Sequence, residues 1–298
     1  MSAPPSPAGP PPQQPPRWRE QEHDIDYLHT QGIRLPKLGL GTFRMEGAAC
    51  QPGVESALAL GYRHIDTATM YENEAEIGAA LAQAALPRDS LHITTKVWHD
   101  QLKPADMERA LETSLRKLRL AQVDLYLVHW PSPGMDLPAI FATLERMRED
   151  GRIRAYGVCN FTVPLLRQSI EEIGAAIACN QIEYHLLLDQ TPVRRYLAQH
   201  GVPVVAYCPL AQGRLAEHPV LAQIAARHDA TPAQVALRWL LDQDGVAAIP
   251  KAGRRESQQA NLDALKLQLS DEDRSQIAAL PKNLRLVSPA FGPVWDQA

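Results

Sequence analysis

Four ionisable side chains in the first half of the chain could together move a proton: Asp66, Tyr71, Lys96 and His129. Each of them has an ordinary explanation when it is considered alone. The aspartate could cap a loop, the lysine could reach solvent along its alkyl stem, and the tyrosine and histidine could pack in a core. Burying several charges in one place is unfavourable unless they pair, however. Their positions at or just after the ends of predicted strands therefore favour one shared site.

These four residue types suit the reduction of a carbonyl, in which carbon receives hydride while oxygen receives a proton. Tyr71 would be the proton donor, although a phenol with an unperturbed pKa of about 10 is a weak acid near neutrality. An ammonium about 4 Å away contributes on the order of 4 kcal/mol at an effective dielectric of about 20, so Lys96 could lower that pKa by up to about three units. Asp66 would hold the lysine and offset part of this shift. His129 would donate a hydrogen bond to the substrate oxygen.

Short apolar segments alternate with amphipathic ones along most of the chain. Parallel strands that are covered by helices on their faces produce this alternation. We expect a short hairpin within residues 33–41, and a capping box from Asn73 to Glu76 that opens the second helix. The expected strands are 38–42, 62–66, 91–97, 123–129, 153–158, 178–182, 202–207 and 246–250. The expected helices are 53–60, 73 to about 86, 106–118, 138–149, 163–173, 191–200, 220–228, 231–243, 255–265 and 270–280.

Eight strands in a chain of this length predict an α/β fold, a closed (β/α)8 TIM barrel with an N-terminal hairpin and an extra C-terminal helix and tail. An open doubly wound sheet is the alternative, but no G-x-G-x-x-G follows the first strand. The active site of such a barrel lies at the carboxyl ends of its strands. Further predicted strand ends carry Asn160, Gln181, Tyr207 and Lys251, so we expect a polar ring there.

The composition of the 298 residues limits the classes of protein and partner. A net charge of −4 gives no sign of nucleic-acid binding. Residues 1–16 contain eight prolines, so we expect residues 1–24 to be a disordered tail before a single domain, 25–298. No apolar run is long enough to cross a membrane and no secretory signal is present, which favours a cytoplasmic protein. Four widely spaced cysteines favour reduced thiols over disulfides or a metal site.

Three segments around the candidate site resemble motifs of the aldo-keto reductase superfamily, and the resemblance covers the chain from about residue 31 to its end. Gly61-Tyr-Arg-His-Ile-Asp-Thr-Ala-x-x-Tyr71 resembles the aspartate–tyrosine motif of that family. Thr94-Thr-Lys-Val-Trp98 is similar to its lysine strand, and Leu127-Val-His-Trp-Pro131 to its histidine strand. The resemblance implies a (β/α)8 barrel, a small-molecule carbonyl substrate, and NADPH bound without a Rossmann fingerprint.

The resemblance also implies where the cofactor binds. Asn160 and Gln181 would hold the nicotinamide carboxamide, and Tyr207 would stack on the nicotinamide ring. The loop 249–255 resembles the segment that binds the adenosine 2′-phosphate, and its three cations suit a phosphate better than a bare ribose. The expected cofactor residues are Thr42, Asn160, Gln181, Tyr207, Leu210, Gln212, Lys251, Arg254, Arg255 and Asn261.

The chain departs from the family pattern at several of these positions. Cys159 and Cys208 stand where the family often has serine, so polar contacts to the cofactor should be weaker there. Ser257 stands where an adenine-stacking arginine is common, and Ala260 where a glutamate is common, while Arg255 could substitute for that arginine. We therefore expect a preference for NADPH without strict exclusion of NADH.

The C-terminal segment 283–296 is similar to the tail of bacterial 2,5-diketo-D-gluconate reductases, particularly the B type, a group that also reduces methylglyoxal. The resemblance implies that α-dicarbonyls and keto-sugar acids are reduced to alcohols by a monomeric enzyme. We expect the tail to fold over the barrel mouth as a substrate wall. Trp98, Trp130 and Phe43 would form an aromatic lining, and Phe43 replaces a frequent tryptophan.

Two other functions remain open beside this leading hypothesis. A lysine at a strand end of a barrel can form a Schiff base, so a lyase that uses Lys96 is one alternative. A non-catalytic NADPH-binding regulatory protein on the same scaffold is the other. The tyrosine–aspartate pair and the cation-rich loop disfavour the lyase, and the complete set of four ionisable groups disfavours a loss of catalysis.

Overall fold

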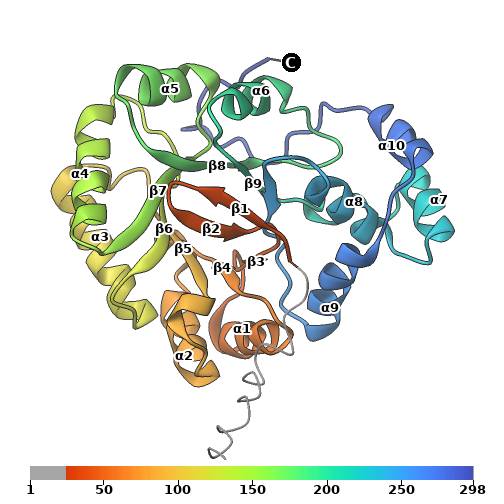
Figure 1. Cartoon of the computed structure of the whole chain (residues 1–298), viewed down its shortest axis with the longest axis horizontal. Coiled ribbons are helices and arrows are strands. Elements are labelled where there is room, and N and C mark those ends of the chain that lie inside the picture. Colours follow the sequence, from red (N-terminus) through yellow and green to blue (C-terminus); the bar gives the residue numbers. More distant parts are fainter. Residues whose placement is uncertain (1–24, 298) are drawn as a thin grey trace, which may run out of the picture.

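The computed structural model describes residues 25–297, in which an eight-stranded parallel sheet lies inside a ring of helices (Figure 1). The tail predicted at residues 1–24 lies outside the described residues. The strands follow one another in chain order, without the reversal that defines a doubly wound sheet. They are β3 (Leu40–Gly41), β4 (His64–Asp66), β5 (His92–Val97), β6 (Val123–Val128), β7 (Ile153–Cys159), β8 (Ile177–Glu183), β9 (Val204–Tyr207) and β10 (Val246–Ala248).

The two outermost strands of this sheet approach each other, so the sheet is curled. The backbone nitrogen of Gly39 donates to the Ala248 carbonyl at 2.9 Å, and that of Gly41 donates to the Pro250 carbonyl at 3.1 Å. A Cβ atom on Gly41 would lie 2.5 Å from the Ile249 carbonyl oxygen, so this close approach requires a glycine. The curled α/β architecture is consistent with the expected (β/α)8 barrel.

Helices cover the outer face of the sheet because their apolar residues recur at helical spacing (Figure 1). In α3, for example, Met107, Leu111 and Leu118 are buried, and Pro104 occupies the first turn. This helix begins two residues before its predicted start, and the other helices also match their predicted ranges to within a few residues. They are α1 (Cys50–Ala59), α2 (Glu74–Ala84), α3 (Pro104–Leu118), α4 (Leu137–Glu149), α5 (Val163–Arg167) continued by η4 (Gln168–Glu172), α6 (Thr191–Gln199), α7 (Pro219–Arg227), α8 (Pro232–Leu241), α9 (Arg255–Asp263) and α10 (Asp271–Ala278).

An antiparallel hairpin of β1 (Tyr27–Thr30) and β2 (Ile33–Pro36) lies across the end of the sheet where the strands begin (Figure 1). It begins before the predicted range and only β2 falls within that range, because residues 31 and 32 form the turn, with positive φ at both positions. Leu35 is fully buried among the apolar side chains inside the sheet, and Thr30 Oγ1 donates to a backbone carbonyl of β8 at 2.9 Å. The hairpin therefore covers the N-terminal end of the curled sheet.

The capping box predicted at Asn73 does not form, although α2 begins directly after this residue. The buried Asn73 amide instead donates to the carbonyls of Thr42 at 2.9 Å and Met45 at 3.1 Å, and it accepts from Thr67 Oγ1 at 2.7 Å. Buried loop carbonyls need donors, and this need decides how the side chain is used. Asn73 thereby ties the loop after β3 to the loop after β4.

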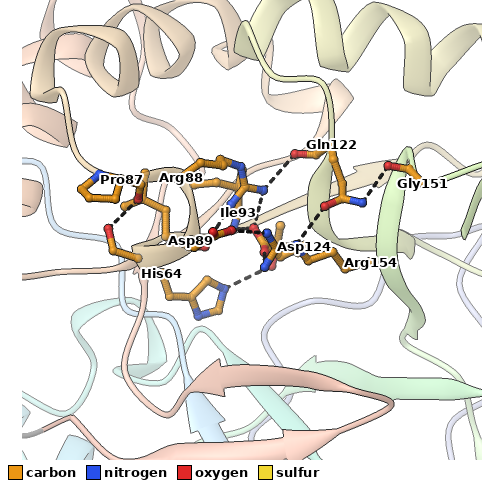
Figure 2. A network of polar contacts seen from close by, with 12 residues as sticks. His64, Pro87, Arg88, Asp89, Ile93, Gln122, Asp124, Gly151 and Arg154 are labelled. Atoms are coloured by element: carbon orange, nitrogen blue, oxygen red, sulfur yellow. Dashed lines mark hydrogen bonds and ion pairs between the residues drawn. The ribbon is translucent and has the colours of Figure 1, made fainter.

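A network of ion pairs joins the N-terminal ends of several strands (Figure 2). Arg88 Nη2 donates to Asp124 Oδ2 at 2.6 Å, and the Ile93 backbone nitrogen donates to the same oxygen at 2.8 Å. Arg154 Nη2 pairs with Asp89 Oδ1 at 2.7 Å. In (β/α)8 barrels, with which this curled sheet is consistent, the N-terminal face serves stability rather than catalysis, so we assign this network a structural role.

Within residues 25–297, no helix has the length and apolar character needed to cross a bilayer. Over the same residues, no group of three or more His, Cys, Asp or Glu side chains is arranged to hold a metal ion. All four cysteines are free thiols.

Candidate active site

Lys96 lies at the centre of the site and is fully buried on β5. Its Nζ atom donates to Asp66 Oδ1 at 2.5 Å and to the Thr67 carbonyl oxygen at 2.8 Å. The same nitrogen lies 3.3 Å from the Tyr71 hydroxyl oxygen. Because β4 pairs in parallel with β5, the carboxylate and the ammonium emerge at neighbouring strand ends. The structure thus brings three of the four predicted catalytic groups into direct contact.

A short helical turn, η2 (Thr69–Tyr71), directs the tyrosine back over the strand ends. Thr69 Oγ1 donates to the Lys96 carbonyl at 3.0 Å, which attaches this turn to β5. The turn ends at Glu72, whose φ is +56°. The ring of Tyr71 lies 5.1 Å from the ring of Phe43, in the loop after β3. Two separate loops therefore hold the phenol in place.

The surroundings of these groups set their protonation states. Burial raises the pKa of Tyr71 to about 12, and the charge of Lys96 opposes this rise without cancelling it. The sequence-based expectation of a lowered tyrosine pKa is therefore wrong in its net direction, because it left out burial. Burial lowers the pKa of Lys96, but the charge and hydrogen bond of Asp66, together with smaller contributions from Tyr71 and Cys159, outweigh burial and the net pKa is raised. Near neutrality the phenol is protonated and the lysine is charged.

His129 follows β6 and faces the same site. Its ring centroid lies 5.6 Å from that of Tyr71 and 5.0 Å from that of Trp98. Asn160 Nδ2 donates to the His129 carbonyl at 3.1 Å and fixes the backbone there. Burial and the nearby charge of Lys96 lower the pKa of His129 well below its usual range, so the imidazole is neutral at neutral pH. Its Nδ1 atom has no hydrogen-bond partner among the described residues.

A cavity of about 520 Å³ opens at the carboxyl ends of the strands. Three of the four predicted catalytic residues line it: Asp66, Tyr71 and His129, while Lys96 lies behind them. Most of the predicted cofactor residues also line it: Thr42, Asn160, Gln181, Tyr207, Leu210, Gln212 and Lys251. The structure therefore gathers the candidate catalytic and cofactor groups around one cavity.

Two amide side chains of the cavity wall, those of Gln181 and Asn160, are held by hydrogen bonds to neighbouring site residues. Gln181 Nε2 donates to Asp66 Oδ2 at 2.8 Å, so this carboxylate uses one oxygen for the lysine and the other for the amide. The Tyr207 hydroxyl donates to Asn160 Oδ1 at 2.7 Å. Asn160 has a φ of +61°, and the left-handed backbone here is one that asparagine tolerates better than most residues. These contacts hold both amides in fixed orientations.

The three predicted phosphate-binding cations lie in the five residues that lead into α9. Lys251, Arg254 and Arg255 are exposed, and none of them pairs with an acidic residue in the described part of the chain. A helix N-terminus adds partial positive charge. Asn261 is buried further along α9 beside the Tyr62 hydroxyl and is not among the cavity-lining residues. Its predicted contact with adenine stays a prediction.

The predicted aromatic lining divides into two groups. Phe43 and Trp130 line the cavity, whereas Trp98 is absent from its lining and packs against His129. The tail adds a side chain that the sequence did not predict: the Phe291 ring stacks at 4.0 Å on that of His99. No local sequence pattern signals a contact between segments so far apart in the chain.

The cavity-lining residues that the sequence interpretation missed as site residues include Arg44, Met70 and Val287. Arg44 directly follows Thr42 and Phe43, so its position after the first strand was a usable signal. Cys159 and Cys208, which were singled out as departures from the family pattern, also line the cavity.

The parallel α/β sheet carries a buried aspartate–lysine–tyrosine set and a histidine at its C-terminal mouth, and this set of groups suits proton transfer to a carbonyl oxygen. The Aldo/keto reductase family model matches residues 37–282, and the chain belongs to this family. It is 44% identical over 268 residues to methylglyoxal reductase DkgB of Escherichia coli O157:H7, a match that covers 89% of this chain and 100% of that protein.

Two further comparisons agree with this assignment. The chain is 39% identical over 265 residues to the glyoxal reductase of Bacillus subtilis strain 168, with 88% of this chain and 95% of that protein covered. A crystal structure provisionally assigned as 2,5-diketo-D-gluconic acid reductase B superposes with a TM-score of 0.89 at 36% identity, covering 94% of this chain and 100% of the other. The predicted relationship to this group of reductases is therefore confirmed.

Proposed function

We propose that the protein reduces aldehydes and ketones to alcohols with NADPH, and that small α-dicarbonyls are its main substrates. The contact of the buried Lys96 Nζ with both Asp66 and the Tyr71 hydroxyl is the observation that supports this function most strongly. The phenol of Tyr71 lines a cavity large enough for a small organic molecule, and the charge of Lys96 lies directly behind it.

In this proposal Tyr71 donates its proton to the carbonyl oxygen as that oxygen gains negative charge. The charge of Lys96 stabilises the phenolate that remains, and Asp66 keeps the lysine charged and in place. His129 is neutral, so it orients the substrate oxygen through a hydrogen bond and not as an acid. The substrate carbon gains hydride and its oxygen gains the proton, which gives an alcohol.

NADPH, when bound, supplies the hydride. Asn160, Gln181 and Tyr207 would hold its nicotinamide end, because they line the cavity beside the proton donor. The cations at the start of α9 would hold the 2′-phosphate. Their lack of acidic partners in the described chain supports this fit, since a phosphate would supply the missing negative charge.

The names of similar proteins support the choice of substrate. Two of them are a methylglyoxal reductase and a glyoxal reductase, and a third is assigned to 2,5-diketo-D-gluconic acid. All three names refer to compounds with more than one carbonyl group. We propose the same class for this chain, with keto-sugar acids as larger members of it.

The geometry of Lys96 disfavours the Schiff-base alternative. Attack on a carbonyl needs a neutral amine, whereas Asp66 raises the pKa of this lysine. Its Nζ atom already contacts three oxygen atoms. The lysine is therefore placed to stabilise charge and not to form a covalent bond.

Several coarser expectations also remain proposals. We propose that residues 25–298 fold as one domain, and that the sheet closes into a barrel through the bonds of Gly39 and Gly41. We also propose a monomer, which size-exclusion chromatography with light scattering would test. The four free thiols agree with a reducing compartment, and we propose the cytoplasm.

The central test is Tyr71→Phe, which removes the proton donor and keeps the ring. We expect turnover of methylglyoxal to fall by at least about a hundredfold, because a positioned general acid contributes a factor of about 10² to 10⁴. NADPH affinity, measured by fluorescence titration, should stay within about twofold. NADPH consumption with methylglyoxal, 2,5-diketogluconate and an aromatic aldehyde, repeated with NADH, would give the substrate and cofactor preference.

A matched control is Tyr27→Phe, which removes the same atom from the hairpin at the opposite end of the sheet. This variant should keep wild-type activity. Turnover retained in Tyr71→Phe would exclude Tyr71 as the proton donor. A wild-type protein that binds NADPH but reduces none of the carbonyls would contradict the proposed function itself.

A further inference from the structure

The carboxylate of Glu183 is fully buried at the end of β8, and the C-terminal tail supplies part of its hydrogen bonding. The Leu286 backbone nitrogen donates to Oε1 at 2.7 Å, and the Val287 backbone nitrogen donates to Oε2 at 2.9 Å. His185 Nε2 lies 3.0 Å from Oε1. A buried carboxylate is stable only with such donors, so strand and tail depend on each other at this point.

This anchor lies next to the substrate cavity. Val287, which the carboxylate holds by its backbone, lines the cavity. Glu183 follows Gln181 by two residues on the same strand, and Gln181 is bonded to the catalytic Asp66. The strand therefore connects the tail anchor rigidly to the catalytic centre.

The tail has a second, outer attachment. Asp296 Oδ2 accepts from the Val163 backbone nitrogen at 3.0 Å, at the start of α5. Phe291 lies between these two attachments in the sequence, and its ring stacks on that of His99. The outer attachment is partly exposed, whereas the inner one is buried and adjoins the cavity.

From these contacts we infer that Glu183 is a positioning residue that fixes Val287 as a wall of the substrate pocket and so determines which carbonyl compounds bind well. The inference rests on the proposed reductase activity. Substrates long enough to reach Val287 need the wall in place, while a three-carbon dicarbonyl bound at Tyr71 needs it much less. Glu183 thus acts on selectivity and not on the chemical step.

An alternative role for Glu183 is to position Tyr207 and thereby affect cofactor binding, because these two residues are partners across β8 and β9. The two roles give different results. Loss of the tail anchor changes KM for large substrates, whereas a disturbed Tyr207 changes NADPH affinity and kcat for every substrate.

The test is Glu183→Gln, in which an NH₂ group replaces an oxygen that accepts from the tail. We expect KM for a bulky aromatic aldehyde to rise about tenfold, the effect of losing one hydrogen bond to a charged group. KM for methylglyoxal, kcat for both substrates and the NADPH dissociation constant should stay within about twofold. Hydrogen–deuterium exchange should become faster in the peptide that contains residues 286 and 287.

Two further variants make the test specific. Val287→Ala removes the wall directly and should reproduce the selective rise in KM without faster exchange along the tail. Glu112→Gln makes the same chemical change at an exposed position on α3 and should alter neither the KM for the bulky aldehyde nor the exchange rate of the tail.

An unchanged KM ratio in Glu183→Gln, or unchanged exchange of the tail, would overturn the inference while the reductase activity stands. A weaker NADPH affinity with an unchanged KM ratio would overturn it in favour of a role through Tyr207. If the wild-type protein reduced no carbonyl compound, both the proposed function and the selectivity role of Glu183 would be wrong. This result differs from the two above, in which the wild-type protein is an active reductase.

Discussion

A charged lysine buried away from water is stable only when neighbouring atoms replace its hydration. At Lys96 these atoms are a carboxylate oxygen of Asp66, the carbonyl of Thr67 and the hydroxyl of Tyr71. The types and spacing of these residues predicted that they meet, because each lies at or just beyond a strand end. The sequence did not show how deeply Tyr71 is buried, and that burial decides the direction in which its pKa moves.

At the residue scale we predict that Asp66→Asn destabilises the fold. The substitution leaves the Lys96 ammonium buried without its counter-charge, and breaking a buried ion pair from one side costs about 3–5 kcal/mol. Urea denaturation followed by circular dichroism would measure the free energy of unfolding. Asp106→Asn, which breaks an exposed pair with Arg109, should change it by less than about 1 kcal/mol. Equal losses in the two variants would contradict the dependence of the fold on this buried pair.

Helices and strands were predicted well where a single sequence pattern, such as the spacing of apolar residues, decides their bounds. The apolar spacing of α3 predicted this helix to within two residues at its start, and its end was correct. Asn73 shows the limit of such patterns. Its sequence context suits a helix cap, but the adjacent buried carbonyls of Thr42 and Met45 take its amide protons. Competition between local and tertiary partners cannot be read from a window of a few residues.

At the element scale we predict that the start of α9 selects the cofactor. Arg255→Ala removes an exposed cation from the first turn, so NADPH should bind about tenfold more weakly while NADH binding changes by less than about twofold. Fluorescence titration of both cofactors would measure this. Arg116→Ala, an exposed arginine on α3, is the control and should leave both affinities unchanged. Equal weakening of NADPH and NADH would show that Arg255 does not contact the 2′-phosphate.

The molecule as a whole contains a pair of buried histidines close to Asp66, the aspartate of the candidate site. The rings of His64 and His92 lie 4.6 Å apart on neighbouring strands, and Figure 2 shows His64 beside the ion-pair network. Burial lowers the pKa of each to about 3. Both side chains are therefore neutral in the folded protein over most of the acid range.

The lowered pKa values of these histidines predict how the free energy of unfolding changes with pH. In the unfolded chain each histidine has a pKa of about 6.5, so between about pH 6.5 and pH 3 the unfolded state binds more protons than the folded state. Stability is therefore complete above about pH 6.5 and is lost as the pH falls. His129 adds a third proton, because burial lowers its pKa as well. Three protons correspond to a slope of up to about 4.1 kcal/mol per pH unit.

Urea denaturation at several pH values above about 5, where most carboxylates stay ionised, would measure this slope. His92→Phe removes one of the three titrating histidines and should lower the slope by about a third. A slope that does not change in this variant would show that the histidines are not the source of the acid sensitivity.

The sequence by itself determined the alternation of strands and helices, the four candidate catalytic residue types at or just beyond the strand ends, and the cation-rich start of α9. These features depend on periodicity and on the order of elements, which are properties of the chain. Only the tertiary structure decided the protonation state of Tyr71, the partners of Asn73 and the attachment of the tail to Glu183. Each of these depends on burial or on contact between distant segments, and both arise only when the elements pack together.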